Sequence, residues 1–201
     1  MNVISFEDIE IYFPPYLSIT SKEELFKGLK QFNHEDFSSF YLFDNIEKLN
    51  TQWAQGDSVS ELDFNGTNRE ALLISNTCDM SLENDRNIPI HVSYVPIAKV
   101  KTVLEMLKEG RHCQSYIKTF IANLKKQKYT NLFYLPSVNP SSEDKVAFLD
   151  MTHSCDKDNL PAPSANKVFC MGNTGFYLFL FKLSVHFTRM MEGLDRSPTN
   201  N

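Results

Sequence analysis

The residues best suited to chemistry in this chain gather around two apolar segments between Arg69 and Ala98. Arg69 stands at the start of the first segment, and the pair Cys78-Asp79 follows its end. His91 lies within the second segment. A thiol with an imidazole as base and a carboxylate to orient it is the arrangement of a covalent nucleophile. The alternative is structural, because cysteine is often buried and an aspartate after a strand commonly closes a turn.

Strands are expected to position these residues. The runs Ala71–Ser75 and Ile88–Ala98 are rich in Ile, Val and Leu, are too short for ordinary helices, and are separated by a polar loop. Before them, Ser58–Phe64 alternates imperfectly between apolar and polar residues, and Asn65-Gly66 predicts a tight turn into the next strand. The sequence therefore predicts three consecutive strands, with the candidate site beside their ends.

The period of the apolar residues becomes helical after Ala98. Two amphipathic runs predict a helical hairpin over residues 99–128, whose first helix closes at Gly110. Strands are predicted at Leu132–Val138 and Val146–Met151.

The last part of the chain predicts a loop and a long helix. Pro161–Asn166 reads as the loop, and the helix runs from about Thr174 to Glu192. A stripe that includes Phe179 and Phe187 defines its buried face, although Leu178 and other apolar residues lie off that stripe. Such a helix is buried on more than one side or is covered by a partner.

The two ends of the chain differ from its middle. Residues 1–55 predict an α-rich extension, with helix caps at Ser21 and Asp44 and many aromatic residues. Residues 196–201 are expected to be a disordered tail. The remaining residues, 56–195, are expected to form one domain.

Composition indicates a globular protein with an aromatic core. The 201 residues include 16 Phe and 8 Tyr but one Trp, and 22% of residues are charged. No apolar run is long enough to cross a membrane, and the first residues lack the basic region of a signal peptide. We therefore expect a cytoplasmic protein without a membrane partner.

The four cysteines predict neither disulfides nor a metal site. They are widely spaced and contain no C-x-x-C motif, and disulfides are rare in the cytoplasm. Zinc stays an alternative, because His112 adjoins Cys113 and His153 precedes Cys155 by two residues. No cofactor or metal is expected.

Charge is distributed unevenly along the chain. The net charge is −5, yet the hairpin segment Lys99–Lys128 holds eight basic and two acidic residues, so that it carries +6 and the rest −11. A basic helical segment can attract RNA or dock on an acidic surface, including that of its own chain, or it can simply be solvated.

Several segments occur in an order that resembles one protein family. They read QGDSVSELDF, NREALLIS and IHVSYVPIA, and EDKVAFLDMTHSCDKDNL follows later. In this order they resemble the barrel core of the MazF/PemK-type toxins, over about half of the chain. The resemblance implies an α+β fold, a small antiparallel β-barrel to which an N-terminal helical extension, an inserted helical hairpin and a C-terminal helix are added. The run ISNTCDM also resembles a loose group of bacterial proteins with a Ser-x-Thr-Cys-Asp motif.

The resemblance implies metal-independent cleavage of single-stranded RNA to a 2′,3′-cyclic phosphate. That reaction needs a base for the 2′-hydroxyl and a cation against the phosphorane charge. Arg69 matches the family's arginine, but Ala98 stands where its threonine is expected, and Glu70 replaces a proline and puts an anion beside the phosphate site. His153, with Thr152 before it, is a candidate for the missing base. If the chain is an enzyme, its catalytic residues are expected among Arg69, His153, Cys78 and Asp79.

A second interpretation is a binding protein. Relatives of this kind act as inhibitors in bacterial regulatory or antiviral circuits, and one holds a sigma factor in a type III CRISPR protease cascade. We therefore predict a catalytically degenerate regulatory protein that binds and inhibits a protein such as a sigma factor or a cognate antitoxin, with the toxin-type endoribonuclease as the alternative. The predicted partner-binding residues are aromatic or basic: Phe37, Phe40, Tyr41, Phe43, Phe181, Lys118 and Lys125.

Overall fold

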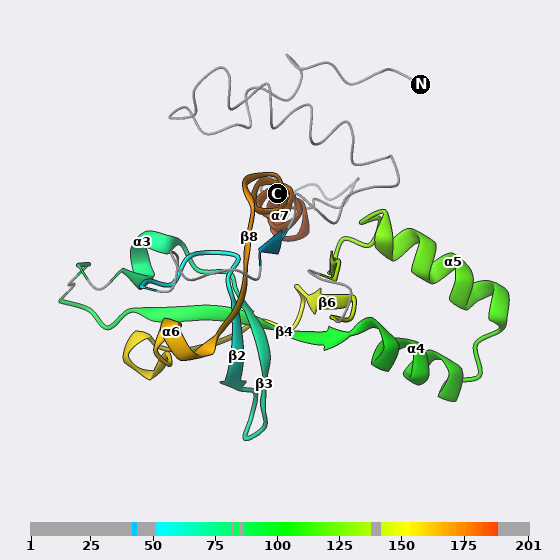
Figure 1. Cartoon of the computed structure of the whole chain (residues 1–201), viewed down its shortest axis with the longest axis horizontal. Coiled ribbons are helices and arrows are strands. Elements are labelled where there is room, and N and C mark those ends of the chain that lie inside the picture. The colour runs from blue at the N-terminus through cyan, green and yellow to red at the C-terminus, as the bar shows by residue number, and fades with distance from the viewer. Residues whose placement is uncertain (1–41, 44–50, 82, 85–86, 138–141, 189–201) are drawn as a thin grey trace, which may run out of the picture.

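The computed structural model describes residues 42–43, 51–81, 83–84, 87–137 and 142–188. Most of the predicted N-terminal extension and all of the predicted tail lie outside these residues. The described residues form a curled antiparallel sheet, shaped like half of a barrel, with helices around it (Figure 1). The predicted α+β class and the small barrel-like sheet are therefore confirmed.

Eight strands in the described residues build this sheet. Their spatial order is β1-β8-β2-β3-β4-β6-β5, and β7 pairs with β4 outside this path. Every pairing is antiparallel. In chain order the strands are β1 (Leu42–Phe43), β2 (Ser58–Asp63), β3 (Asn68–Leu73), β4 (His91–Lys99), β5 (Leu132–Leu135), β6 (Lys145–Phe148), β7 (His153–Asp156) and β8 (Lys167–Met171).

The hairpin between β2 and β3 turns at the Asn-Gly pair that the sequence indicated. Asn65 and Gly66 have φ values of 55° and 87°. Positive φ at both central residues is what a type I′ turn requires, and glycine adopts it without strain. The N–H of Gly66 also donates to Oδ1 of Asp63 (2.7 Å).

Strand β4 is the point at which the sheet curls. Tyr94–Pro96 pairs with β3 along one edge of β4. Along the other edge, His91–Tyr94 pairs with β7 and Ile97–Lys99 pairs with β6. One strand thus joins the β8-β2-β3 part of the sheet to two separate short strands.

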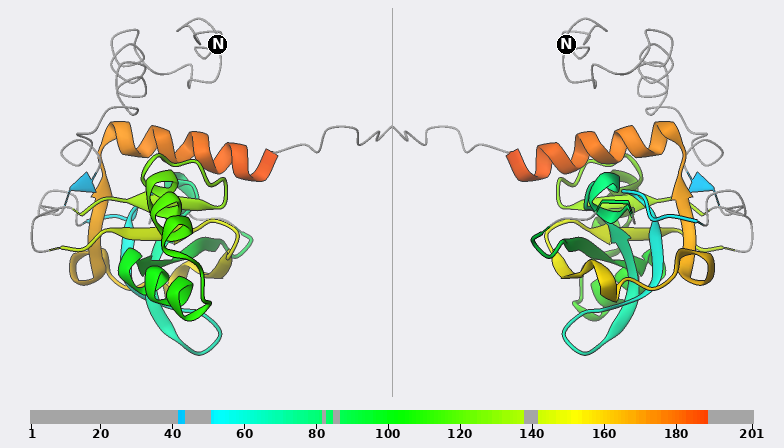
Figure 2. Two further views of the ribbon diagram at one scale, coloured as in Figure 1. Left: turned by 90° about the vertical axis from the view of Figure 1, so that its right-hand side faces the viewer. Right: turned by 90° about the vertical axis from the view of Figure 1, so that its left-hand side faces the viewer.

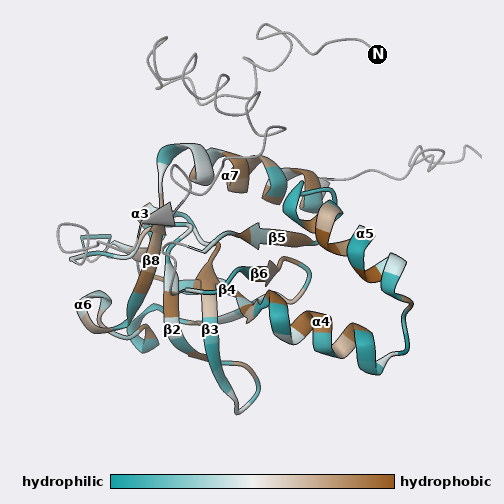
Figure 3. Cartoon of the chain, turned by 45° about the vertical axis from the view of Figure 1, so that its right-hand side comes forward, coloured by the Kyte–Doolittle hydropathy of each residue, from teal (hydrophilic) through white to brown (hydrophobic). Residues whose placement is uncertain are grey.

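Two helices, α4 (Val100–Glu109) and α5 (Gln114–Lys125), form the predicted hairpin, which projects from one end of the sheet (Figure 1). Phe120 and Leu124 of α5 pack with Val100 of α4 and with Leu132 and Val146 in one cluster of buried residues. Hydrophilic and hydrophobic residues occupy different sides of both helices (Figure 3). The apolar faces therefore anchor the hairpin on β5 and β6.

The long helix α7 (Asn173–Thr188) lies along one side of the sheet (Figure 2). Leu178 and Phe179 are buried, whereas Phe181 and Phe187 are 54% and 60% exposed. The predicted stripe was therefore wrong in part, because it included Phe187 and left Leu178 out. The C-terminal end of the helix extends past the sheet (Figure 2).

Both faces of the sheet are covered by apolar residues. Successive strand residues point to opposite faces, so Leu72 packs in one cluster with Phe179 of α7. Ala71 and Leu73 pack in the other cluster, with Trp53. β3 is consequently buried on both faces along its second half.

Three strands were missed by the sequence interpretation. They are β7, β8 and the two-residue β1, which lies in the segment predicted to be α-rich. The predicted strand Val146–Met151 ends at Phe148, and after a turn the chain forms β7. β8 was also missed, because it begins with a lysine, Lys167, and is only five residues long. The predicted loop Pro161–Asn166 contains the short helix α6 (Pro163–Asn166). Two further short helices are α3 (Thr77–Met80) and η2 (Lys157–Asn159).

A buried ion pair ties β8 to the segment before β2. Nζ of Lys167 lies 2.7 Å from Oδ2 of Asp57, and the two side chains are 2% and 3% exposed. The ammonium also donates to the carbonyl of Gln52 (2.7 Å) and lies 5.4 Å from the Trp53 ring centroid. Burial raises the pKa of Asp57, and the hydrogen bond and charge of Lys167 oppose that rise.

A second buried lysine joins α7 to the end of α5. Nζ of Lys182 donates to the backbone carbonyl (2.7 Å) and to Oε1 (2.9 Å) of Gln127. The Gln127 amide in turn bonds the backbone of Tyr134 on β5, accepting from its N–H (3.1 Å) and donating to its carbonyl (2.8 Å). Burial lowers the pKa of Lys182 to about 7.

Candidate functional site

Arg69 lies on the exposed end of β3, beyond the part that is buried. Its backbone pairs with Leu62 of β2, and no hydrogen bond or ion pair joins its side chain to another described residue. The β3–β4 ladder ends at Ala71 and Pro96, so Arg69 and Ala98 each lie two residues beyond that pair. The position that the family resemblance connects with the catalytic threonine is thus an alanine outside the part of β4 that pairs with β3.

Glu70 lies on the opposite face of β3 and is fully engaged there. Its carboxylate accepts from Nζ of Lys145 (2.6 and 2.8 Å) and from the hydroxyl of Ser58 (2.7 Å). The two side chains of the ion pair are 22% and 18% exposed. The expectation that Glu70 opposes a phosphate beside Arg69 is thus not supported, since a lysine within the protein neutralises it.

His153 lies on β7, opposite Tyr94 of β4. Its ring packs edge-on against Phe64 (centroids 4.8 Å apart) and stacks with Tyr94 (6.3 Å). No described contact joins His153 to Arg69, and its position is that of a ring packed in an aromatic cluster.

Thr152 also belongs to a turn. Its hydroxyl donates to the carbonyl of Leu149 (3.3 Å), and the residue is exposed. That bond closes the turn between β6 and β7.

Cys78 and Asp79 lie in the short helix α3. The side chain of Asn76 caps this helix by accepting from the N–H of Cys78 (3.0 Å). His91 does not join them, because its Nδ1 lies 3.4 Å from Oδ1 of Asp156 on β7. The carboxylate that partners His91 is therefore Asp156, which the sequence interpretation missed. The available sequence signal was the segment HSCD (His153–Asp156), read as a strand. Pairing this strand with β4 would place Asp156 opposite His91 and on the same face of the sheet.

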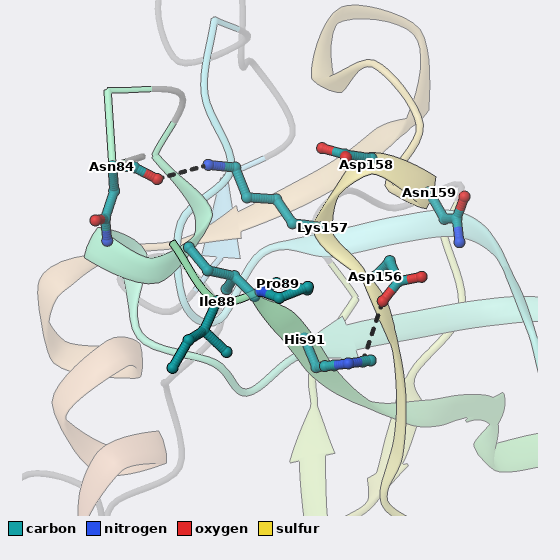
Figure 4. Close-up of a pocket in the computed structure, with 9 residues that line it drawn as sticks. Asn84, Ile88, Pro89, His91, Asp156, Lys157, Asp158 and Asn159 are labelled. Atoms are coloured by element: carbon teal, nitrogen blue, oxygen red, sulfur yellow. Dashed lines mark hydrogen bonds and ion pairs between the residues drawn. The ribbon is translucent and has the colours of Figure 1, made fainter. Parts of the chain in front are cut away.

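A pocket of about 610 Å³ lies where β4 begins and β7 ends. One wall is the segment Ile88–His91, the other is Asp156–Asn159, and Asn84 completes the lining (Figure 4). Lys157 turns its ammonium to the carbonyls of Ser81 (2.6 Å) and Asn84 (3.1 Å). The pocket thus combines exposed carboxylates, an imidazole and an apolar wall.

The basic hairpin docks in part on its own chain. Lys125 pairs with Asp144 (3.2 Å), and its ammonium lies 5.7 Å from the ring centroid of Tyr134. Lys99 pairs with Glu143. Lys118 is exposed. Two of the cations at the base of the hairpin are therefore neutralised by the acidic turn before β6.

The predicted aromatic contact residues are described only in part. Phe37, Phe40 and Tyr41 lie outside the described residues. Phe43 is in β1, where its backbone pairs with Cys170. Phe181 is exposed on α7.

The cysteines in the described residues are all free thiols. Cys113 stands at the N-cap position of α5, and hydrogen bonds with the hydroxyl of Ser115 and the backbone of Tyr116 lower the pKa of its thiol. Within the described residues no three His, Cys, Asp or Glu side chains gather as a metal site.

No helix in the described part of the chain combines the length and the apolar character that crossing a membrane requires. Comparison with known proteins gave no family model that matches the chain and no matching curated protein.

Proposed function

We propose that the chain is a regulatory protein that binds and inhibits another protein, built on a degenerate MazF/PemK-like barrel. The observation that carries this proposal is the outer side of α7. Two phenylalanines there, Phe181 and Phe187, expose more than half of their surface. Large apolar side chains left in water are typical of a surface that a partner covers.

The helical period supports one continuous contact on this side. At about 3.6 residues per turn, Phe181 and Phe187 flank the exposed Ser184, on the side of α7 away from the buried Phe179 and Lys182. Leu180 is half-buried between them. A partner helix or apolar groove that meets this side would bury both rings together.

The partner class comes from the resemblance. One inhibitory relative of the MazF/PemK-type barrel holds a sigma factor, so a sigma factor is the partner that we propose, with a cognate antitoxin as the other candidate. The absence of the catalytic threonine at Ala98 supports binding over cleavage.

Capture of the partner tests this function. The full chain, immobilised and exposed to a lysate of its own host, is expected to retain one protein in near-stoichiometric amount. Phe181→Asp with Phe187→Asp should reduce the recovery at least about tenfold, because charges would replace the buried rings. Met106→Asp, at another exposed apolar side chain on α4, is the matched control and should leave recovery unchanged. Equal recovery with both variants would contradict the role of α7, and recovery of no protein would contradict the function.

The ribonuclease alternative has one supporting observation of its own. Lys145 neutralises Glu70 on the far face of β3. The carboxylate of Glu70 therefore does not compete with a phosphate for the exposed Arg69. A guanidinium in this position can hold a phosphate. Incubation with mixed-sequence RNA should then give cyclic-phosphate ends, and Arg69→Ala should abolish them.

A further inference from the structure

Strand β7 lies at an edge of the described sheet. It pairs with β4, and no other described strand pairs with it. Its residues alternate between half-buried and exposed, with Ser154 and Asp156 exposed. An exposed edge strand offers backbone N–H and C=O groups to an added strand.

The hydrogen-bond pattern identifies which backbone groups face this edge. Opposed residues in an antiparallel ladder alternate between pairs that exchange hydrogen bonds and pairs that do not. The N–H of Lys157 donates to the carbonyl of Ile90 (2.9 Å). Lys157–Ile90 is therefore a bonded pair, and so is every second pair along the ladder from it, starting with Cys155–Val92. Ser154 and Asp156 belong to the non-bonded pairs between them, so their backbone N–H and C=O groups point away from β4.

The other side of β4 supports this assignment independently. Ser93, which is opposite Ser154, gives its N–H to the hydroxyl of Ser75 (2.7 Å). Its carbonyl accepts from the N–H of Ile74 (3.0 Å). The backbone of Ser93 is thus turned away from β7, as a non-bonded pair requires.

The free edge leads into the pocket described above, and Asp156 belongs to both (Figure 4). Asp158 also lines the pocket, and Asp156 lies 3.4 Å from Nδ1 of His91. The ammonium of Lys157 keeps its charge but points away from Asp156, toward the carbonyls of Ser81 and Asn84 (Figure 4). The segment before β4 adds Ile88, which is 75% exposed. A strand laid along β7 would therefore bring its side chains to two carboxylates and an apolar surface.

We propose that this edge of β7 docks an extended, basic segment of the protein partner. The segment adds a strand to the sheet through the backbone of Ser154 and Asp156, and one of its Lys or Arg side chains enters the pocket toward Asp156 and Asp158. Main-chain hydrogen bonds supply affinity in this mode, and alternate side chains supply specificity. The inference rests on the proposed function, since it describes where and by what chemistry the partner is held.

The charge of the carboxylates beside this edge favours a basic segment as its binding partner. The exposed carboxylates beside the edge repel an acidic strand, and they attract a basic one, with a dependence on salt that a purely main-chain contact lacks. A second copy of this chain would bring its own Asp156 and Asp158 to the same interface, so a basic partner segment is favoured over self-association.

A labelled peptide tests the site on the full chain. The probe is a fluorescein-labelled peptide of alternating Lys and Val, measured by anisotropy against a matched peptide of alternating Glu and Val. The basic peptide should bind and the acidic one should not. Methylation of the peptide nitrogens on one edge of the basic probe should weaken binding about tenfold, since each blocked hydrogen bond is worth roughly a kcal/mol.

Three variants place the peptide on β7. Ser154→Pro removes the outward N–H without removing a bond to β4, and proline is tolerated at sheet edges, so it should weaken binding about tenfold. Ser154→Ala keeps that N–H and should bind as the unmodified chain does. Asp156→Asn with Asp158→Asn should reduce both the affinity and its salt dependence.

Several results would overturn the proposal. They are binding that Ser154→Pro leaves unchanged, equal binding of the acidic peptide, insensitivity to peptide methylation, or a dimer of the chain that blocks the edge. If Ser154→Pro fails to fold, binding of the methylated peptide to the unmodified chain still tests whether main-chain hydrogen bonds hold the segment. If Ser154→Pro does not weaken capture of the partner, the docking site on β7 is contradicted, but the proposed binding function is not. The α7 variants test that function separately.

Discussion

Two lysines in the described residues, Lys167 and Lys182, are buried to a similar degree but are held in different ways. Counted over the whole residue, backbone included, they are 9% and 6% exposed. Lys167 meets the carboxylate of Asp57. Lys182 meets the two oxygens of Gln127, which carry no charge.

The difference shows what a buried charge needs in order to persist. A counter-charge offsets much of the cost of removing an ammonium from water, whereas neutral dipoles offset less. Burial accordingly lowers the pKa of Lys182 to about 7. Lys167 forms a fixed link between β8 and the segment before β2, and Lys182 forms a link between α7 and α5 whose charge depends on pH.

Removing the counter-charge should have the largest effect. Asp57→Asn leaves the Lys167 ammonium buried without a charged partner, and we expect a loss of about 3–5 kcal/mol in the free energy of unfolding. Urea denaturation at neutral pH measures it. The double variant with Lys167→Met should recover much of the loss, and a single variant as stable as the unmodified protein would show that the pair is not needed.

The pH dependence of stability should separate Lys182 from Lys167. The pKa of Lys182 is about 7 in the folded protein and 10.5 in its ordinary state. Between these values the unfolded chain holds a proton that the folded protein lacks, so stability rises with pH by about 1.4 kcal/mol per unit at most. Below about pH 7 both states hold the proton and this contribution is constant.

Lys182→Met removes the contribution of this lysine. Between about pH 7 and 10.5, the free energy of unfolding of the unmodified protein should therefore rise relative to that of the variant as pH increases. Parallel curves would mean that the folded protein keeps this lysine protonated throughout.

A half-buried pair should give a smaller effect and complete the comparison. Glu70→Gln keeps a side chain that can bond Ser58 but removes the charge that faces Lys145, and we expect a loss of about 1–2 kcal/mol. Denaturation under the same conditions measures it. Lys99→Gln, at the exposed pair with Glu143, is the control and should cost less than Glu70→Gln.

Elements with a strong apolar period could be predicted from the sequence. The hairpin α4–α5 repeats its apolar residues at helical spacing, and Asn65-Gly66 has the residues that a tight turn demands. β7 and β8 gave weak signals, because His153 and Cys155 are ambiguous between core and site, and Lys167 hides the start of a buried strand. Their pairing depends on contacts with residues far away in the sequence, which no local pattern contains.

The candidate site was harder still to predict. A sequence places Glu70 beside Arg69, and only the fold brings in Lys145 from 75 residues away to neutralise it. The same holds for His91, whose carboxylate partner, Asp156, comes from another strand. Charges that meet across strands are therefore the part of a site that spacing alone does not reveal.

The amide of Gln127 has a consequence for solubility. By bonding both the N–H and the carbonyl of Tyr134, it occupies backbone groups of β5 with a side chain instead of a strand. Another copy of the chain finds no template for sheet growth at that residue, which is how proteins avoid edge-to-edge aggregation. Shortening this one side chain would leave the N–H and the carbonyl of Tyr134 without this partner and would remove one of the two acceptors of the Lys182 ammonium.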